Sequence, residues 1–154
     1  MQENNSGFLQ RRHGECPRSC WRLSSVRPTR VVKNTAKTIL VIDDNEDARN
    51  LLGAALRHDG YRVCEAENGR DALDQLEAMS QLPCLLLLDM MMPIMSGQEL
   101  LEALHERPRL ASVPVVLLSA GIRPSQAPDV KVFMGKPTDL RMLRTVVREL
   151  CGDP

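Results

Sequence analysis

From residue 38 to the end of the chain, short runs of apolar residues alternate with stretches of mixed polarity. The first run spans residues 38–42. The stretch after it spaces its apolar residues three or four positions apart and stops at Gly60; they are Ala48, Leu51, Leu52, Ala55 and Leu56. A run of this length is typical of a strand, and the later spacing forms one face of a helix. The pattern therefore predicts a strand followed by a helix.

The same unit of strand and helix occurs twice more, and two further strands follow. Strands are predicted at residues 61–66, 84–88, 113–118 and 130–134, and a helix is predicted at the end from the stripe Leu140, Leu143, Val146, Val147 and Leu150. Residues 85–88 are four leucines, which indicates burial on both faces of a sheet. Parallel strands joined by helical crossovers provide such burial. We therefore expect an α/β fold with a doubly wound five-stranded parallel sheet and helices on both faces.

Residues 1–37 differ from the rest of the chain in pattern and in charge. They show neither helical nor alternating periodicity, and they contain eight Lys or Arg against two Asp or Glu, a net charge of +6. Residues 38–154 contain twelve basic and eighteen acidic residues, a net charge of −6. We expect a basic, disordered extension at 1–37 and one domain at 38–151. The acidic domain favours a cation site over nucleic-acid binding. The extension around Trp21 leaves anionic lipid or nucleic acid as an alternative to a solvated segment.

Composition and cysteine usage indicate the compartment. Aromatic residues make up 3% of the chain, so the core is expected to be aliphatic. No apolar run near the N-terminus is long enough for a signal peptide or a membrane span. The cysteines are odd in number and scattered: Cys16, Cys20, Cys64, Cys84 and Cys151. We therefore expect free thiols and the reducing cytoplasm. A zinc site at His13, Cys16 and Cys20 is an alternative, but a fourth ligand and the usual spacing are missing.

Polar residues stand where the predicted strands end. In a doubly wound sheet, ligands bind beyond the carboxyl ends of the strands. Asp43 and Asp44 follow the first strand and Asp89 follows the third, and carboxylates brought together in this way need a cation such as Mg²⁺. Ser119 ends the fourth strand and Lys136 follows the fifth, which adds two groups able to hold an anion. This combination indicates phosphoryl chemistry. An alternative is that Asp43, Asp44 and Asn45 only cap the next helix, and Asn45 or Asp44 could also cap it in addition to the site.

The order of these strand-end residues carries a resemblance to a known family. The residues concerned are Asp43-Asp44, Asp89 to Pro93 with Ser96-Gly97, Ser119-Ala120 and Lys136-Pro137. Together they resemble the receiver domains of response regulators, in the CheY-like superfamily, over roughly residues 38–150. The resemblance implies a flavodoxin-like strand order, 2-1-3-4-5, and a cytoplasmic phosphoprotein of a two-component phosphorelay.

The resemblance also implies a phosphoacceptor and a set of metal ligands. Asp89 would attack a phosphohistidine and become an acyl phosphate. Mg²⁺ would be bound by Asp44 and Asp89, by Asp43 through a metal-bound water, and by the backbone carbonyl of Met91. Met91 and Gly121 stand at positions that tune the lifetime of the acyl phosphate in the family. We expect the Met91 side chain to screen the acyl phosphate from attacking water.

Three further residues take roles from the resemblance. Lys136 and Ser119 would contact the phosphoryl oxygens, whose charge must be met by donors already in place. After transfer, Ser119 would move toward the phosphoryl group, and Phe133, three positions before Lys136, would follow into the vacated space. Ser119 and Phe133 are therefore the expected switch residues.

The segment between the fourth strand and Lys136 departs from the family pattern. Seventeen positions separate Ser119 from Lys136, fewer than the resemblance leads us to expect, and Pro124 and Pro128 lie where a helix would form. We expect the fourth helix to be short or absent, which puts the usual output face in doubt.

The resulting functional prediction is a single-domain receiver. It would accept a phosphoryl group on Asp89 from a histidine kinase or histidine phosphotransfer protein and signal to an unknown downstream protein, because the chain stops at Pro154 without an output domain. Membrane and nucleic-acid partners are not expected, nor is catalysis beyond the protein's own phosphorylation and dephosphorylation. Alternatives are a receiver-like scaffold that is not phosphorylated and a phosphohydrolase, although Met91 stands where the latter needs a carboxylate. A nucleotide-binding flavodoxin-like protein is less favoured, because no Gly-rich loop follows the first strand.

Overall fold

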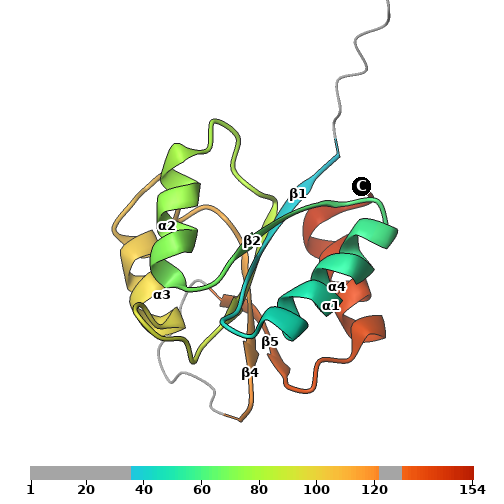
Figure 1. Ribbon diagram of the computed structural model, residues 1–154. Helices are drawn as coiled ribbons and strands as arrows, with labels where there is room; N and C mark the ends of the chain where they lie inside the picture. Colours follow the sequence, from blue (N-terminus) through green and yellow to red (C-terminus); the bar gives the residue numbers. More distant parts are fainter. Residues whose placement is uncertain (1–35, 122–129) are drawn as a thin grey trace, which may run out of the picture. The chain divides into compact units, whose positions relative to one another are not determined.

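Strands and helices alternate along the chain (Figure 1), as the sequence pattern predicts. The computed structural model describes residues 36–121 and 130–154. In these residues the strands are β1 (Thr38–Ile42), β2 (Arg62–Ala66), β3 (Leu85–Asp89), β4 (Val115–Ser119) and β5 (Val130–Gly135). The helices are α1 (Glu46–His58), α2 (Gly69–Ala78), α3 (Gly97–His105) and α4 (Leu140–Cys151).

The strands form one parallel sheet in the order β2-β1-β3-β4-β5. β3 is central: Leu86 lies beside Leu40 of β1, and Leu88 lies beside Leu117 of β4. β2 and β5 are the edge strands. The predicted doubly wound, flavodoxin-like order is therefore confirmed. Because all five strands are parallel, their carboxyl ends meet at one edge of the sheet.

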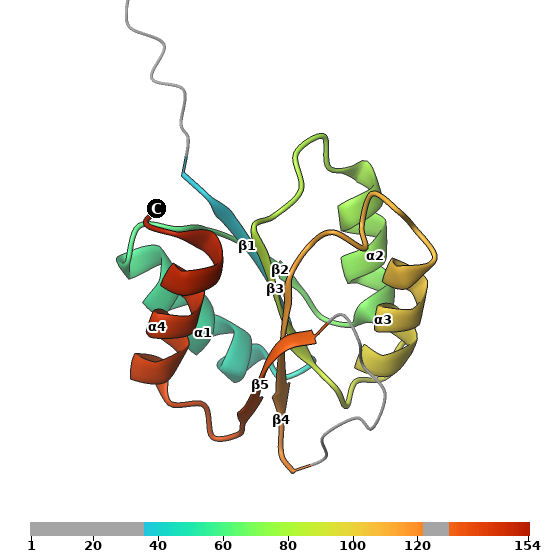
Figure 2. The same cartoon turned by 180° about the vertical axis from the view of Figure 1, so that it is seen from behind.

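Helices cover both faces of the sheet (Figures 1 and 2). α2 and α3 lie on one face, and α1 and α4 lie on the other. Every residue of β3 is buried. Leu86 and Leu88 pack in the cluster on the α2 and α3 side, whereas Leu85 and Leu87 pack in the cluster on the α1 and α4 side. The four consecutive leucines thus fill both halves of an aliphatic core, which is why a continuous apolar run suits this strand.

Polar N-caps start the helices and leave the acidic residues after β1 free for other contacts. The side chain of Asn45 accepts a hydrogen bond from the first turn of α1, at 2.9 Å. Ser96 and Glu99 form a capping box at the start of α3. Such caps satisfy N–H groups that have no partner within the helix. Asn45 is thus the capping residue of α1, whereas Asp43 contacts Lys136 and so does more than cap a helix.

The prediction that all five cysteines are free thiols is wrong. Cys84 and Cys151 form a disulfide, with their Cα atoms 5.5 Å apart. Cys84 lies one residue before β3, and Cys151 is the last residue of α4. A separation of 67 positions conceals this pairing in the sequence, because only the packing of α4 on the sheet brings the two residues together. Cys64, on β2, is a free thiol.

Several predictions concern residues 1–35 and 122–129, which lie outside the described residues. These are the disordered N-terminal extension, the zinc alternative at His13, Cys16 and Cys20, and most of the connection between β4 and β5. The expected short or absent fourth helix falls in this connection and so also lies outside the described residues. Within the described ranges no helix is long and apolar enough to cross a membrane.

Candidate functional site

Four of the predicted site residues meet at the carboxyl edge of the sheet. Asp43 directly follows β1, Asp89 ends β3, Ser119 ends β4 and Lys136 directly follows β5. Asp43 is fully buried, Asp89 is 6% exposed and Ser119 is 3% exposed. Buried polar side chains are uncommon unless they have partners, so their gathering at one edge marks a site and not a solvated turn.

The acidic residues at this edge form a cluster suited to a cation. One carboxylate oxygen from each of Asp43, Asp44 and Asp89 lies within 4.8 Å of the other two. Asp43 and Asp89 are buried, whereas Asp44 is exposed. Carboxylate oxygens are hard ligands, the kind that Mg²⁺ prefers, and the exposed side leaves room for the waters that this ion keeps. The donor set therefore fits Mg²⁺.

Lys136 joins the two buried carboxylates. Its Nζ lies 2.7 Å from Oδ2 of Asp43 and 3.1 Å from Oδ2 of Asp89. Burial by itself would lower the pKa of Lys136, but the hydrogen bonds and charges of Asp43 and Asp89 outweigh burial, so the pKa is raised. One ammonium cannot balance three carboxylates. The uncompensated negative charge is a second reason to expect a divalent cation here.

Asp43 is held by contacts on both of its carboxylate oxygens. Oδ1 accepts a hydrogen bond from the backbone N–H of Asn45 at 2.9 Å, and Oδ2 accepts one from Lys136. The guanidinium of Arg49 also donates to the backbone carbonyl of Asp43 at 2.7 Å. Sequence reasoning did not identify Arg49, because an Arg in the second turn of a helix gives no local sign that it reaches back to a strand end. These contacts hold both the carboxylate and the backbone of Asp43 in place.

Asp89 is less constrained than Asp43. In the described part of the chain its one charged contact is to Lys136, through Oδ2. Oδ1 is thus available for a new bond. Gly97 keeps the loop after β3 close to this residue, because a Cβ at position 97 would collide with the backbone carbonyl of Asp89. Gly97 also donates its N–H to the carbonyl of Met90 at 3.1 Å, which closes the loop.

Ser119 and Phe133 occupy places compatible with their predicted roles as switch residues. Asp89 pairs with Leu118, so Ser119 lies one position beyond Asp89 on the neighbouring strand. The backbone carbonyl of Ser119 accepts a hydrogen bond from the N–H of Lys136 at 2.9 Å. Phe133 is half-buried on β5 and packs against the core cluster on the α2 and α3 side. Its ring contributes through packing, because it carries no hydroxyl.

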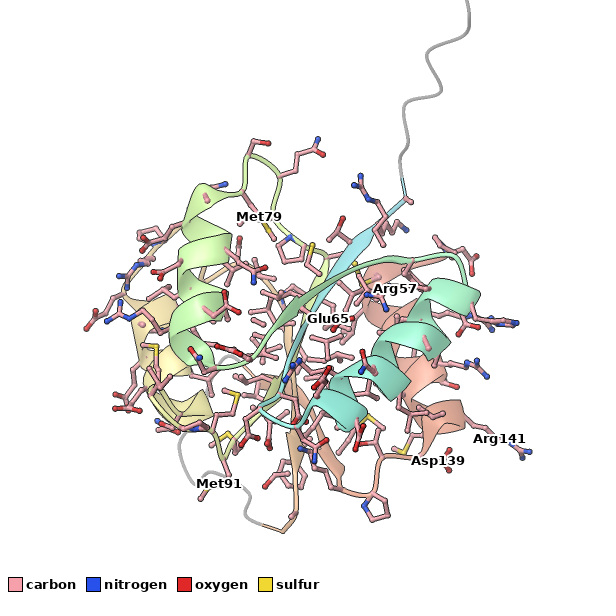
Figure 3. All side chains as sticks on the ribbon, viewed as in Figure 1. Arg57, Glu65, Met79, Met91, Asp139 and Arg141 are labelled. Atoms are coloured by element: carbon pink, nitrogen blue, oxygen red, sulfur yellow. A yellow bond between two sulfur atoms is a disulfide. The ribbon has the colours of Figure 1, made fainter. Side chains whose placement is uncertain are left out.

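Met91 lies on the surface of the loop after β3. Its side chain is 73% exposed, and Figure 3 shows it at the lower margin of the domain, at the edge where the strands end. Ile94, in the same loop, is also exposed and has a positive φ of 69°. Positive φ is unusual for a β-branched residue, and no local sequence pattern signals it.

Comparison with known proteins identifies the family. Residues 39–148 match the family model of the response regulator receiver domain. An uncharacterized 14.6 kDa protein of Leptolyngbya boryana is 35% identical over 73% of this chain and 88% of its own length. Response regulator Rre1 of Synechocystis is 34% identical over 73% of this chain, but the match spans 51% of Rre1. Histidine kinase P4 of Formosa agariphila is 37% identical over 58% of this chain, and the match spans 6% of that kinase.

The solved structures agree with the sequence relatives. The crystal structure of response regulator TrrA from Thermotoga maritima, in complex with Mg²⁺ and BeF, covers 74% of this chain and 98% of its own, with 30% identity and a TM-score of 0.66. The signal receiver domain of a histidine kinase from Syntrophus aciditrophicus covers 75% and 89%, with 29% identity and a TM-score of 0.67. This chain therefore belongs to the response regulator receiver-domain family of two-component phosphorelay signalling.

Proposed function

We propose that the chain is a single-domain response regulator that accepts a phosphoryl group on Asp89 from a histidine kinase or a histidine phosphotransfer protein. The observation that carries the proposal is the contact of one ammonium, Lys136, with both Asp43 and Asp89 inside an acidic cluster. A phosphoryl group needs fixed positive charge around its oxygens and a free carboxylate oxygen as its acceptor. The site offers both.

The acceptor step follows from the positions of these side chains. Oδ1 of Asp89 attacks the phosphorus of a phosphohistidine, the P–N bond breaks, and the bonding electrons leave with the imidazole nitrogen. Lys136 then turns its ammonium from the carboxylate oxygens to a phosphoryl oxygen, and the hydroxyl of Ser119 donates to another. The carboxylates of Asp43, Asp44 and Asp89, with the backbone carbonyl of Met91, would hold Mg²⁺, which supplies further positive charge for the phosphoryl oxygens.

Signalling would follow from the new negative charge. When Ser119 turns toward the phosphoryl group, Phe133 packs into the space behind it, and the surface around β5 changes for a partner protein. The site performs no reaction beyond the phosphorylation and dephosphorylation of the protein itself. We place this signalling in the cytoplasm, where histidine kinases draw on ATP. The receiver domain would span 38–151, and 1–37 would be a disordered basic extension.

The direct test is phosphorylation by a small phosphodonor. The protein is incubated with acetyl phosphate and Mg²⁺, and its intact mass is followed beside Asp89→Asn and the matched control Asp74→Asn, an exposed aspartate of α2. The proposal expects one phosphoryl group on the wild type and on Asp74→Asn, dependent on Mg²⁺, and none on Asp89→Asn. If no phosphoryl group is added, and beryllofluoride with Mg²⁺ leaves the amide spectrum unchanged, the chain is an unphosphorylated scaffold instead.

A further inference from the structure

Helix α4 is fastened at its C-terminal end by a disulfide that the phosphoryl chemistry does not use. We propose that Cys84 and Cys151 form a reversible thiol–disulfide switch, which fixes the last turn of α4 to the sheet and responds to small-molecule disulfides and dithiols. The inference rests on the proposed function, because that function sets the compartment in which the two sulfurs act. It gives the domain a second input at the edge of the sheet opposite Asp89.

The two cysteines lie where a covalent link between them restricts the movement of α4 relative to the sheet. Cys84 immediately precedes the central strand β3, and its N–H donates to the carbonyl of Thr38 at 2.8 Å, so its backbone is fixed to β1. Cys151 is the last residue of α4. Figures 1 and 2 both show the C-terminus beside the start of β1, at the edge away from the strand ends that carry the site. The disulfide therefore ties α4 to the residue that precedes the fully buried central strand.

The disulfide holds the end of α4, and other contacts hold the rest of the helix. Leu143, Val146 and Val147 are buried against the sheet, so α4 stays docked whichever state the sulfurs adopt. Beyond Cys151, the hydroxyl of Tyr61 donates to the carbonyl of Gly152 at 2.7 Å. This single neutral hydrogen bond holds the end of the chain less strongly than a covalent bond does. Opening the disulfide is therefore expected to loosen the last turn and the residues after it without unfolding the domain.

A reversible disulfide fits this pair of cysteines better than a permanent structural disulfide. In the cytoplasm thiols are kept reduced, and the disulfides found there are mostly transient, catalytic or redox-sensing. The domain also has two extensive apolar clusters, so it has a core of its own without a covalent link. Cys151 is buried, whereas Cys84 is partly exposed, so the Cys84 side is where we expect an external thiol or disulfide to approach.

The chemistry balances with a small-molecule disulfide as the oxidant. The thiolate of Cys84 attacks one sulfur of glutathione disulfide, which forms a mixed disulfide and expels one glutathione thiolate. The thiolate of Cys151 then attacks the sulfur of Cys84 and expels the second glutathione. Two protein thiols lose two electrons and two protons, and one glutathione disulfide becomes two glutathione thiols. A dithiol such as dithiothreitol runs the same exchange in reverse and becomes a cyclic disulfide.

Cys64 cannot substitute for either partner in the folded domain. It packs with the cluster on the α2 and α3 side of the sheet, whereas Cys84 and Cys151 pack with the cluster on the α1 and α4 side. The sheet separates the thiol from the disulfide. Cys64 is therefore a built-in control, a free thiol that oxidants meet without any effect on α4.

Both inputs act on the same helix. α4 begins at Leu140, four positions after Lys136, whose ammonium contacts Asp43 and Asp89. Its other end carries Cys151. Phosphorylation therefore acts near the first turn of α4, and the thiol–disulfide pair acts at its last turn. The redox state thus sets how much of α4 can move when the site is phosphorylated.

The test uses the full chain in glutathione buffers of varied ratio, without denaturant. After an acid quench and alkylation, peptide mapping by mass spectrometry should find a linked Cys84–Cys151 peptide that rises with glutathione disulfide and disappears with dithiothreitol. Reduction should lower the Tm by roughly 10 °C. Amide exchange in the last turn of α4 should become faster by on the order of tenfold, with little change around Leu143.

Variants assign the effect to this pair. Cys84→Ser should abolish the shift of Tm between the two buffers, and Cys151→Ala provides a second variant if Cys84→Ser fails to fold. Cys64→Ser is the matched control and should keep the full shift. A link that never forms in folded protein, or one that dithiothreitol opens only in denaturant, overturns the switch. The assay needs no phosphodonor, so a protein that passes it and still cannot be phosphorylated overturns only the proposed function.

Discussion

The ammonium of Lys136 lies 2.7 Å from Oδ2 of Asp43, a residue 93 positions earlier in the chain. The contact joins the ends of β1 and β5, which are not neighbours in the sheet. It therefore has to cross above the ends of β3 and β4, where Asp89 and Ser119 stand. The pair therefore spans the site, and we expect its charge balance to set how the site responds to substitution and to cations.

Replacing Lys136 by Met should make the stability of the fold respond more strongly to a divalent cation. Without the ammonium, the buried carboxylates of Asp43 and Asp89 repel each other, which we expect to cost about 1–2 kcal/mol, discounted because Lys136 is partly exposed. Thermal unfolding in EDTA should show a lower Tm than that of the wild type, and Mg²⁺ should restore more stability to the variant than to the wild type. Lys131→Met, an exposed position on β5, is the control. Equal Mg²⁺ responses in both variants would argue against the charge imbalance.

Removal of Mg²⁺ should destabilise the wild-type protein and leave a variant without the acidic cluster unaffected. A ligand that binds only the folded state stabilises by about 2.7 kcal/mol at a hundred times its Kd. A titration of Tm with MgCl₂, matched in ionic strength by NaCl, should rise for the wild type and stay flat for Asp44→Asn combined with Asp89→Asn. A rise of the same size in the double variant would place the cation elsewhere.

Gly97→Ala should disturb the phosphoacceptor through the backbone. A Cβ at position 97 would lie 2.9 Å from the Cα of Met90 and closer still to the carbonyl oxygen of Asp89, so the loop after β3 has to move. We expect a loss of about 1–3 kcal/mol in the free energy of unfolding and slower phosphorylation. Gly135→Ala is the matched control, because nothing lies within 4 Å of a Cβ there. Urea unfolding and acetyl phosphate labelling measure the two effects, and a variant as stable as the control would contradict the close approach.

Tyr61 should make stability fall at alkaline pH. Burial first, and then the charge of Asp153, raises the pKa of its hydroxyl above the ordinary value of 10.0. Because the folded state holds the proton more tightly, its contribution is complete below about pH 10 and is lost as the pH rises from there through the raised pKa. Tyr61→Phe should be less stable at neutral pH by about 1 kcal/mol, since Gly152 loses its donor. Unfolding curves from pH 8 upward should converge for the two proteins, and parallel curves would contradict the raised pKa.

Met91→Asn should shorten the lifetime of the acyl phosphate several-fold. Met91 stands in the loop directly after Asp89, and a polar amide there would admit and orient water where a thioether excludes it. Loss of the phosphoryl group is followed by intact mass after the donor has been removed. Met142→Asn, another exposed methionine, is the control. An unchanged lifetime would show that Met91, with its exposed side chain, does not screen the site.

The parts of the fold that follow from repeated local patterns were predictable from the sequence. Four leucines in a row indicate a strand buried on both faces, which a parallel sheet covered by helices provides. Asp43, Asp89, Ser119 and Lys136 could be placed together because parallel strands bring their carboxyl ends to one edge.

Features that depend on distant packing were not predictable. The Cys84–Cys151 disulfide depends on where α4 lies against the sheet, and no local pattern encodes that position. The bond from Arg49 to the carbonyl of Asp43 and the positive φ of Ile94 arise from side-chain reach and loop closure. The sequence indicated which polar groups stand at the strand ends. The contacts that hold those groups in place could be identified only from the folded structure.

The placement of Asp89 on the strand with neighbours on both sides makes the sheet unequal in stiffness. β3 is hydrogen-bonded to β1 and β4 and is buried along its whole length, so the carboxylate of Asp89 stands on a strand enclosed on every side. β5, by contrast, has one neighbour and exposed residues. We do not expect a charge added to Asp89 to displace β3, because strands on both sides hold β3 in place. If Asp89 is phosphorylated as proposed, we expect the displacement at β5 and the helix that follows it, with β3 as the fixed support.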